Sequence, residues 1–309
     1  MEIAVLAMAL AIDLSVGEFP NPVHPVVWMG KLALLLEKIG TGKRPLFQFV
    51  YGTVLTLFLA GLFAVAAFFL LSWLNGISLI AYLITGALVL KSAFSLKALH
   101  LAAVRIKILL AQDKLTQARF ELRSLVSRDT KDMSTSLAVS ATVESVAENI
   151  CDSFVAPLFY FLIFGIPGAI GYRVINTLDA MIGYHGKYEY LGKFAAHLDD
   201  FLNLIPARLS ALLLVLASLL SGRGARGAWC GVVENHARTE SPNAGWSMSA
   251  VAGALGIQLE KPGHYRLGHP DVPLVPETID ASLTLMSIAA AAWVIICFAA
   301  GGLYFALTT

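Results

Sequence analysis

Long apolar segments alternate with polar ones along this chain, and the apolar segments predict helices embedded in a membrane. The cleanest is 281–307, which exceeds the ~20 residues that a helix needs to cross a bilayer. Segments 46–74 and 77–96 are separated by an Asn-Gly pair, a turn signal, so we expect a helical hairpin. The short segment 3–16 has no basic n-region and no small-residue cleavage site, so we expect a retained helix.

Two further apolar segments are interrupted or short. The stretch 153–171 is broken by "FGIPGA" at 164–169, and each half would reach only ~18 Å as a helix. Because the hydrocarbon core of a bilayer is ~30 Å thick, we expect a re-entrant or surface-lying helix pair there. The stretch 206–220 is also short and ends in "SGRG".

These patterns predict an all-α, polytopic integral membrane protein. We expect about four to six membrane-embedded helices, with cytoplasmic amphipathic and re-entrant helices, in a single membrane-embedded domain covering residues 1–309. The composition agrees, because 57% of the residues are hydrophobic and only 14% are charged, against ~25% charged in soluble domains. The net charge of +1 gives no case for nucleic-acid binding. Three widely spaced cysteines predict neither a disulfide framework nor a zinc site.

The polar segments contain the residues that could carry chemistry. They are the regions 17–45, 127–152, 172–208 and 222–280. The stretch 97–125 predicts one amphipathic helix with a basic face, and its Lys and Arg content places it on the cytoplasmic side. If 153–171 is re-entrant, the polar motifs before and after it lie on that same side. A shared active site facing the cytoplasm is therefore expected.

Three acidic residues share one face of a helix that we expect to begin near Thr135, capped by Asp132 or Ser134. They are Glu144, Glu148 and Asp152, at positions i, i+4 and i+8. No Lys or Arg lies four residues away to offset their mutual repulsion. The stripe is therefore either a water-facing surface or a place where carboxylate oxygens bind a divalent cation such as Mg²⁺.

Other polar side chains lie beside apolar runs, where unpaired polar groups are costly. Arg173 could hold an anion in a bidentate fork, and Asn149 offers both a donor and an acceptor. A proline and a glycine flank the turn before Trp246, which by itself indicates a tight loop leading into a closely packed helix of small residues. The remaining candidates, for which helix caps, surface ion pairs or a structural histidine are the ordinary explanation, are Arg128, Asp129, Asn176, Asp179, Asp199, Asp200, Arg208, Asn243 and His24.

Sequence motifs for nucleotide binding are absent. The stretch "GTGKR" lacks the earlier glycine and the trailing Ser or Thr of a P-loop. No GxGxxG follows a predicted strand, and no HExxH or GxSxG pattern occurs. Composition and spacing alone therefore indicate a polytopic protein with an acidic, amide-rich site on one side of the membrane.

Six motifs follow one another from Asp13 to about Tyr265. They are "DLSVGEFPNPVHPVVWMGK", "SRDT", "ATVESVAENICDSFVAPLFY", "INTLDAMIGY", "HLDDFLNLIPARL" and "SPNAGWSMSAVAGALG". In this order they resemble the CbiB/CobD family of adenosylcobinamide-phosphate synthases. The departures are Ser127 in place of a frequent Gly, Ala180 in place of a frequent Ser, and His197 in place of a frequent Arg. None of them removes an acid or an amide of the stripe.

The resemblance implies a step of cobalamin biosynthesis. Members of the family join the propionate carboxyl of adenosylcobyric acid to the amine of (R)-1-amino-2-propanol phosphate, or of unphosphorylated aminopropanol. The product with the phosphorylated amine is adenosylcobinamide phosphate, and the reaction uses ATP and Mg²⁺. The partners implied are therefore a corrinoid, an amine substrate and the lipid bilayer. Homo-oligomers, or association with other membrane enzymes of the pathway, are compatible with it.

The resemblance also implies roles for the candidate residues. Metal and Mg-ATP binding would fall to Glu144 and Glu148, with Asp152 or Asp179 as base or further ligand. Phosphate would be contacted by Arg128 with Asp129, and by Arg173. The corrinoid amides would be positioned by Asn149, Asn176 and Asn243, and its ring by a groove lined by Trp28, Trp246 and Tyr184. The other substrate-binding candidates are His24, Asp199, Asp200 and Arg208.

Two other classes of function remain open at this point. An AmpE-like membrane sensor without ligase activity is a divergent relative, although the "VESVAEN", "NTLD" and "PNAGW" motifs argue against it. A small-solute transporter would be expected to show two related halves, which the sequence lacks.

Overall fold

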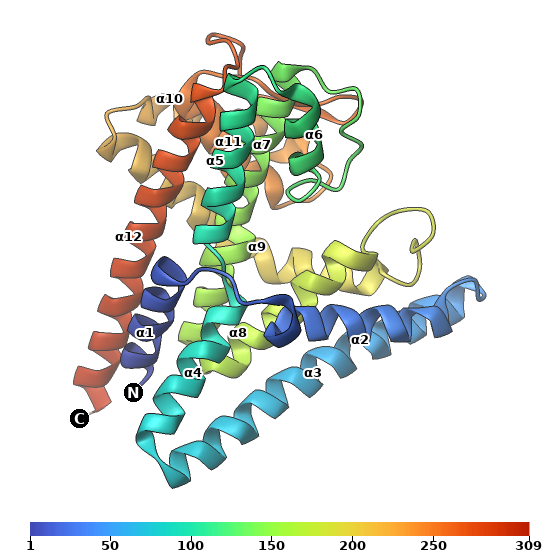
Figure 1. Cartoon of the computed structure of the whole chain (residues 1–309), viewed down its shortest axis with the longest axis vertical. Helices are drawn as coiled ribbons and strands as arrows, with labels where there is room; N and C mark the ends of the chain where they lie inside the picture. The colour runs from blue at the N-terminus through green and yellow to red at the C-terminus, as the bar shows by residue number, and fades with distance from the viewer. Residues whose placement is uncertain (309) are drawn as a thin grey trace. The chain divides into compact units, whose positions relative to one another are not determined.

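The computed structural model describes residues 1–308, and these form helices and one small pair of strands (Figure 1). The α-helices are α1 Glu2–Ser15, α2 Pro25–Gly40, α3 Pro45–Ile77, α4 Leu79–Ala93, α5 Lys97–Ala111, α6 Leu115–Leu122, α7 Thr135–Ile150, α8 Ala156–Ile182, α9 Lys193–Leu220, α10 Ala225–Asn235, α11 Ala244–Leu255 and α12 Glu277–Thr308. The π-helix Cys151–Val155 joins α7 to α8. Strands β1, Leu259–Lys261, and β2, Tyr265–Leu267, pair antiparallel. The predicted all-α class is confirmed.

The chain forms two compact units whose segments interleave along the sequence. Unit 1 comprises Met1–Ser95, Ala156–Asn203 and Cys297–Thr309, and unit 2 comprises Leu96–Val155 and Leu204–Ile296. The expectation of a single membrane-embedded domain stays a prediction.

Four helical segments are long and apolar enough to cross a bilayer among the described residues. They are Pro45–Ile77, Thr135–Ile182, Lys193–Leu220 and Glu277–Leu303, and a fifth arises if α4 and α5 together count as one span. On α3, the side chains of Phe58, Phe69 and Trp73 are all more than half exposed. An apolar exterior of this kind is what a lipid-facing helix presents. The protein is therefore a multi-pass membrane protein.

The predicted hairpin of α3 and α4 in unit 1 is confirmed, but its turn lies elsewhere (Figure 1). Asn75 and Gly76 remain helical inside α3, and the break falls at Ser78. The Ser78 hydroxyl accepts a hydrogen bond from the backbone N–H of Ala81, so it caps α4. A cap stabilises the new helix directly, whereas an Asn-Gly pair only permits a turn.

The predicted break near the middle of α8 is also confirmed. Gly165 has φ +67° and ψ −163°, which only glycine adopts without strain. Tyr160 and Tyr172 stack with ring centroids 5.2 Å apart, although twelve residues of straight helix would separate them by ~18 Å. The chain therefore folds back on itself at Gly165, as expected for a re-entrant pair.

Helix α9 is longer than the sequence indicated. It begins at Lys193 and continues through Pro206, so the expected short segment 206–220 is wrong. A proline inside a helix leaves the carbonyl four residues earlier without its usual donor. Here that carbonyl is on Leu202, and it accepts a hydrogen bond of 2.8 Å from the Tyr160 hydroxyl. The helix can therefore pass through the proline without an unsatisfied carbonyl.

The basic stretch 97–125 in unit 2 is a helical hairpin rather than one helix. Helices α5 and α6 are joined by a turn in which Asp113 has φ +56°, a left-handed conformation (Figure 1). The two helices are linked by an ion pair of 2.7 Å between Arg105 and Glu121. The single amphipathic helix is wrong because Asp can take this conformation without a Gly or Pro in the sequence to mark it.

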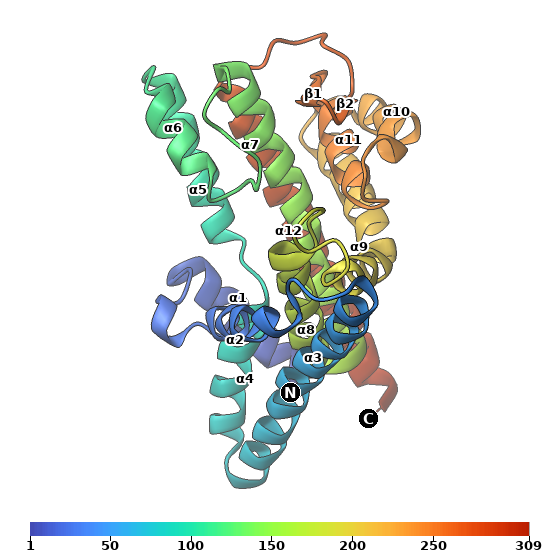
Figure 2. The same ribbon diagram turned by 90° about the vertical axis from the view of Figure 1, so that its right-hand side faces the viewer.

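Helices α10 and α11 of unit 2 pack at very short range (Figure 2). Glycines at Gly227, Gly231 and Gly253 provide the contact. A Cβ added to Gly231 would lie 2.6 Å from the carbonyl oxygen of Ser249, and one added to Gly253 would lie 2.1 Å from that of Gly227. The interpretation of the small-residue stretch as a closely packed helix is confirmed.

Candidate functional site

Helix α7 carries the acidic residues and lies in the interior of unit 2. It begins where expected, because the Ser134 hydroxyl accepts a hydrogen bond from the backbone N–H of Leu137. Every residue from Ala138 to Ala147 is buried, so the helix has no water-facing side over this stretch. The interpretation of the stripe as a solvated surface is therefore wrong at Glu144.

Glu144 is the centre of a hydrogen-bonded network. Its Oε2 accepts from Arg128 Nη2 and from the Tyr265 hydroxyl, both at 2.9 Å. Its Oε1 accepts from the Ser140 hydroxyl at 2.6 Å, one turn earlier on α7. Since a buried carboxylate is costly unless it is paired, these three donors are what allows the charge to reside there.

The same network connects α7 to the β-hairpin. The backbone N–H of Glu260, on β1, donates to the Ser140 hydroxyl at 2.8 Å. Burial raises the pKa of the Tyr265 phenol, and the charge of Glu144 raises it further. Tyr265 therefore keeps its proton and remains a donor to Glu144 over the whole physiological pH range.

Arg128 belongs to the "SRDT" loop, which α6 holds in place. The Thr130 hydroxyl donates to the carbonyl of Arg119 at 2.8 Å, and the Arg119 guanidinium donates to the carbonyl of Met133 at 2.8 and 2.5 Å. The Nη1 atom of Arg128 is buried and has no hydrogen-bond partner among the described residues. A guanidinium nitrogen in this state is ready to bind an oxygen from a ligand.

The expected magnesium site of Glu144, Glu148 and Asp152 is not assembled. Glu144 is already occupied by three donors, one of them a cation. Asp152 lies in the π-helix, where the wider turn ends the i, i+4, i+8 spacing. The described residues hold no group of three or more His, Cys, Asp or Glu side chains placed to bind a metal ion. These carboxylates therefore do not fit a protein-bound Mg²⁺ as a set.

Asn149 was expected to position an amide-rich substrate, and the structure engages both ends of its side chain. Its Nδ2 donates to the Ser145 carbonyl at 3.0 Å, and its Oδ1 accepts from the Ser153 hydroxyl at 2.9 Å. These contacts stabilise the junction between α7 and the π-helix.

Two cavities flank the β-hairpin within unit 2. The first, of about 300 Å³, is lined by Arg128, Asp129, Asp132, Met133, Leu137, Glu260, Lys261, Pro262 and His264. The second, of about 430 Å³, is lined by Arg238, Glu260, Lys261, Gly263, His264, Tyr265 and Arg266. Their volumes are in the range of small-ligand sites. Arg128 and Asp129, both predicted to contact phosphate, share the wall of the first cavity.

Arg208, Asn243 and Trp246 were predicted as substrate-binding residues, and they come together in unit 2. The Arg208 guanidinium lies over the Trp246 ring at 4.5 Å, and its Nη1 lies 3.5 Å from Asn243 Oδ1. The His236 ring also packs against Trp246, at a centroid distance of 4.3 Å. The buried Nε1 of Trp246 has no hydrogen-bond partner among the described residues.

A second polar cluster lies in unit 1, on α8 and α9. Asp199 accepts hydrogen bonds from Asn203 at 2.9 Å and from Asn176 at 3.3 Å. Arg173 donates to Asn176 at 3.3 Å. The carboxylates of Asp179 and Asp200 are near enough to act on that of Asp199 electrostatically. All five predicted residues of this region, Arg173, Asn176, Asp179, Asp199 and Asp200, are thus brought together.

His24 belongs to a different network in unit 1. Its Nδ1 accepts the backbone N–H of Val26 at 3.1 Å and so caps α2. Its other ring nitrogen, Nε2, therefore carries the proton that is donated to Glu18. Glu18 also accepts from Ser95 at 2.6 Å and lies 3.4 Å from the ammonium of Lys91. His24 thus has a structural role here, whereas a substrate contact stays a prediction.

Several residues of these networks were missed by the sequence analysis. Tyr265 lies 121 residues from Glu144 along the chain, and no spacing rule links the two. Lys91 could have been identified from the sequence, because a lysine inside an apolar run must be paired. Trp28 and Tyr184 are each about half exposed, and the corrinoid groove that they were expected to line stays a prediction.

Comparison with known proteins finds relatives that share one family name. The family model described as "CobD/Cbib protein" matches residues 6–301. A protein named "Cobalamin biosynthesis protein CobD" from Dehalococcoides mccartyi is 52% identical over 307 residues, covering 99% of each chain. A protein named "Probable cobalamin biosynthesis protein CobD" from Methanothermobacter thermautotrophicus is 40% identical, and the match covers 93% of this chain and 94% of the relative. A protein of the same name from Thermococcus kodakarensis is 39% identical, and the match covers 94% of this chain and 92% of the relative.

No solved structure matches the chain significantly. The family match extends over nearly all of the sequence, and the relatives are similar from end to end. These matches include the "SRDT" loop, α7 and the β-hairpin that build the Glu144 network. The chain belongs to the CobD/Cbib family, whose role is in cobalamin biosynthesis.

Proposed function

We propose that this protein forms the amide bond between adenosylcobyric acid and (R)-1-amino-2-propanol phosphate, or aminopropanol, in a reaction driven by ATP. The observation that carries the proposal is the Arg128 guanidinium beside a cavity, held by the buried carboxylate of Glu144. A fixed cation at a cavity wall is what phosphoryl transfer requires, since that chemistry depends on positioning and charge neutralisation.

The carboxylate of the corrinoid must be activated before an amine can attack it. One of its oxygens attacks the γ-phosphorus of ATP, the bond from that phosphorus to the bridging oxygen breaks, and ADP leaves. The amine nitrogen then attacks the acyl carbon of the acyl phosphate. The bond from this carbon to the phosphate oxygen breaks, orthophosphate leaves, and the ammonium proton passes to a carboxylate.

Within this scheme Arg128 neutralises phosphate oxygens, and Glu144, Ser140 and Tyr265 hold it in place. Magnesium enters as part of the MgATP substrate, because Mg²⁺ in such sites is bound largely by substrate phosphates. Of the two carboxylates predicted as the base, Asp152 lies in the same unit as Glu144, and Asp179 lies in unit 1.

We also propose that the site faces the cytoplasm. The "SRDT" loop follows α5 and α6, which carry many Lys and Arg residues, and such segments are retained on the cytoplasmic side. Cysteine labelling from each side of the membrane at an exposed position such as Lys114 tests this orientation.

Genetic complementation tests the function itself. A bacterial strain unable to make cobinamide from cobyric acid should grow under cobalamin-dependent conditions when it carries the wild-type gene. The Arg128→Ala variant should not restore growth at equal protein level, whereas Arg223→Ala, at an exposed position in the turn after α9, should. Failure of the wild-type gene, at confirmed membrane expression, would argue against the proposal.

A further inference from the structure

Lys261 lies on the inner face of the β-hairpin. In the strand register Lys261 is opposite Tyr265, and Leu259 is opposite Leu267. Residues that are opposite each other, or two apart on one strand, share a face of the ribbon. Leu259 and Leu267 are fully buried, and Tyr265 donates to Glu144. Lys261 therefore projects from the face that carries the Glu144 network.

On the opposite face of the hairpin, the charged side chains are paired with one another. Glu260 and Arg266 form a cross-strand pair there, with Arg266 Nη2 2.9 Å from Glu260 Oε1. At the turn, His264 is paired with Glu240 at 2.8 Å. The side chain of Lys261, in contrast, makes no hydrogen bond or ion pair with any residue in the described part of the chain. Lys261 is half-buried and its ammonium is not paired with a carboxylate, so it is available to bind an anion.

Two cationic groups thus meet at the 300 Å³ cavity without full partners. Lys261 and Arg128 both line it, and Arg128 Nη1 is buried without a hydrogen bond. Asp129 and Asp132 line the same cavity, and their carboxylates suit a phosphate that arrives as its magnesium complex. Lys261 also lines the larger cavity, so it stands between the two.

We propose that Lys261 and Arg128 together bind the phosphate group of a substrate in this cavity. The chemistry that they recognise is a phosphate oxyanion, which Arg binds as a fork and Lys as a point charge. This phosphate belongs either to ATP or to aminopropanol phosphate. The choice of these two ligands rests on the proposed function. The site itself depends only on the geometry of unit 2.

Direct binding to the full-length protein in detergent tests the proposal. Calorimetric titration measures the dissociation constants of MgATP, of aminopropanol phosphate and of their phosphate-free counterparts, adenosine and aminopropanol. In Lys261→Ala, we expect binding of one phosphate ligand to weaken about tenfold, because a charge-assisted hydrogen bond is lost. The weakened ligand identifies which substrate occupies the cavity. Adenosine and aminopropanol should bind as they do to the wild type.

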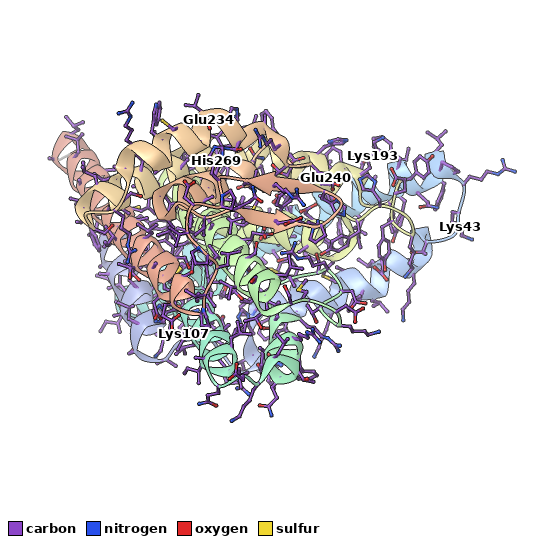
Figure 3. All side chains as sticks on the ribbon, turned by 90° about the horizontal axis from the view of Figure 1, so that it is seen from above. Lys43, Lys107, Lys193, Glu234, Glu240 and His269 are labelled. Atoms are coloured by element: carbon purple, nitrogen blue, oxygen red, sulfur yellow. The ribbon has the colours of Figure 1, made fainter. Side chains whose placement is uncertain are left out.

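Two further variants separate charge from folding. Lys261→Arg keeps the positive charge and changes only the geometry of the contact. Its dissociation constant for the phosphate ligand should therefore stay within about threefold of the wild-type value. Lys43→Ala, in the exposed turn between α2 and α3, removes a lysine that lines neither cavity and should change nothing (Figure 3). Thermal unfolding of each variant verifies that it is folded.

The outcomes distinguish this inference from the proposed function. If Lys261→Ala binds MgATP and aminopropanol phosphate as tightly as the wild type, the inference is overturned while amide formation is unaffected. If adenosine or aminopropanol weakens as much as its phosphorylated form, the inference is also overturned. If the wild type binds a phosphate ligand through Lys261 but forms no amide, the inference stands and the proposed function fails.

Discussion

The ammonium of Lys91 lies 3.2 Å from Oδ1 of Asp13, and neither side chain is more than 2% exposed. The same ammonium donates to the carbonyl of Phe94 at 3.2 Å and lies 3.4 Å from Glu18. The pair joins the end of α4 to the end of α1 within unit 1. Since a lysine in an apolar segment is tolerated only when paired, the two charges depend on each other.

Replacing Lys91 by Ala should destabilise unit 1 strongly. The change leaves Asp13 and Glu18 without their cation, and breaking a buried pair costs about 3–5 kcal/mol. Thermal unfolding in detergent measures the effect. Lys31→Ala, at an exposed position of α2, serves as the control and should unfold as the wild type does.

The double variant Lys91→Met with Asp13→Asn should recover part of the loss, because removing both charges avoids an unpaired buried ion. A double variant no more stable than Lys91→Ala would contradict the account of this pair.

Stability should depend on the ionisation of Glu18 at acid pH. Burial raises the pKa of Glu18, but hydrogen bonds from His24 and Ser95 and the charge of Lys91 more than offset this, giving a pKa of about 2 instead of 4.5. Because the folded pKa is lowered, the stabilisation is complete above pH 4.5 and is lost as the pH falls toward 2. The unfolding temperature of wild type minus that of Glu18→Gln should therefore shrink over this window. A difference that stays constant from pH 6 to pH 3 would refute the linkage.

The close contact of α10 and α11 should not tolerate a methyl group. Gly231→Ala would place a Cβ 2.6 Å from the backbone carbonyl of Ser249, so the helices must separate. We expect a loss of about 1–3 kcal/mol, measured by thermal unfolding. Gly61→Ala on α3 is the matched control, since nothing lies within 4 Å of its added methyl. That change should be neutral or stabilising by up to about 1 kcal/mol, because Ala favours a helix over Gly.

Tyr265 should be required to hold the Glu144 network together. Tyr265→Phe removes the 2.9 Å hydrogen bond to Glu144, a bond to a charged group worth about 1.5–3 kcal/mol. Amide formation should fall by at least about tenfold, through kcat, because Arg128 loses part of its support. Tyr190→Phe, at an exposed position, should leave the rate unchanged. Equal rates for wild type and Tyr265→Phe would remove Tyr265 from the site.

Parts of this fold were predictable because a local rule decides them. The Ser134 cap starts α7, Gly165 breaks α8, and the apolar run of α12 needs no partner to be recognised. The prediction of one helix over 97–125 was wrong because Asp113 turns the chain in a conformation that the sequence does not mark. The beginning of α9 was misjudged because a distant residue, Tyr160, satisfies the carbonyl that Pro206 leaves free, so the helix continues through the proline.

The candidate site also has one part that was predictable from the sequence and one part that depends on tertiary contacts. The sequence indicated Arg128, Glu144 and the cluster around Asp199, since polar groups beside apolar runs need an explanation. It did not indicate that Glu144 would be used by Arg128 and Tyr265 rather than by a metal, because that depends on a hairpin 121 residues away. Burial of α7 on all sides between Ala138 and Ala147, which excludes a water-facing side at Glu144, is a property of tertiary packing alone.

The most direct test of the central claim is product analysis with the purified full-length protein. The protein in detergent is given adenosylcobyric acid, MgATP and aminopropanol phosphate, and the corrinoid and nucleotide products are identified by mass spectrometry. We predict adenosylcobinamide phosphate and ADP in equal amounts, with neither formed by Arg128→Ala. If the folded wild-type protein, supplied with all three substrates, yields no amide, the claim is contradicted.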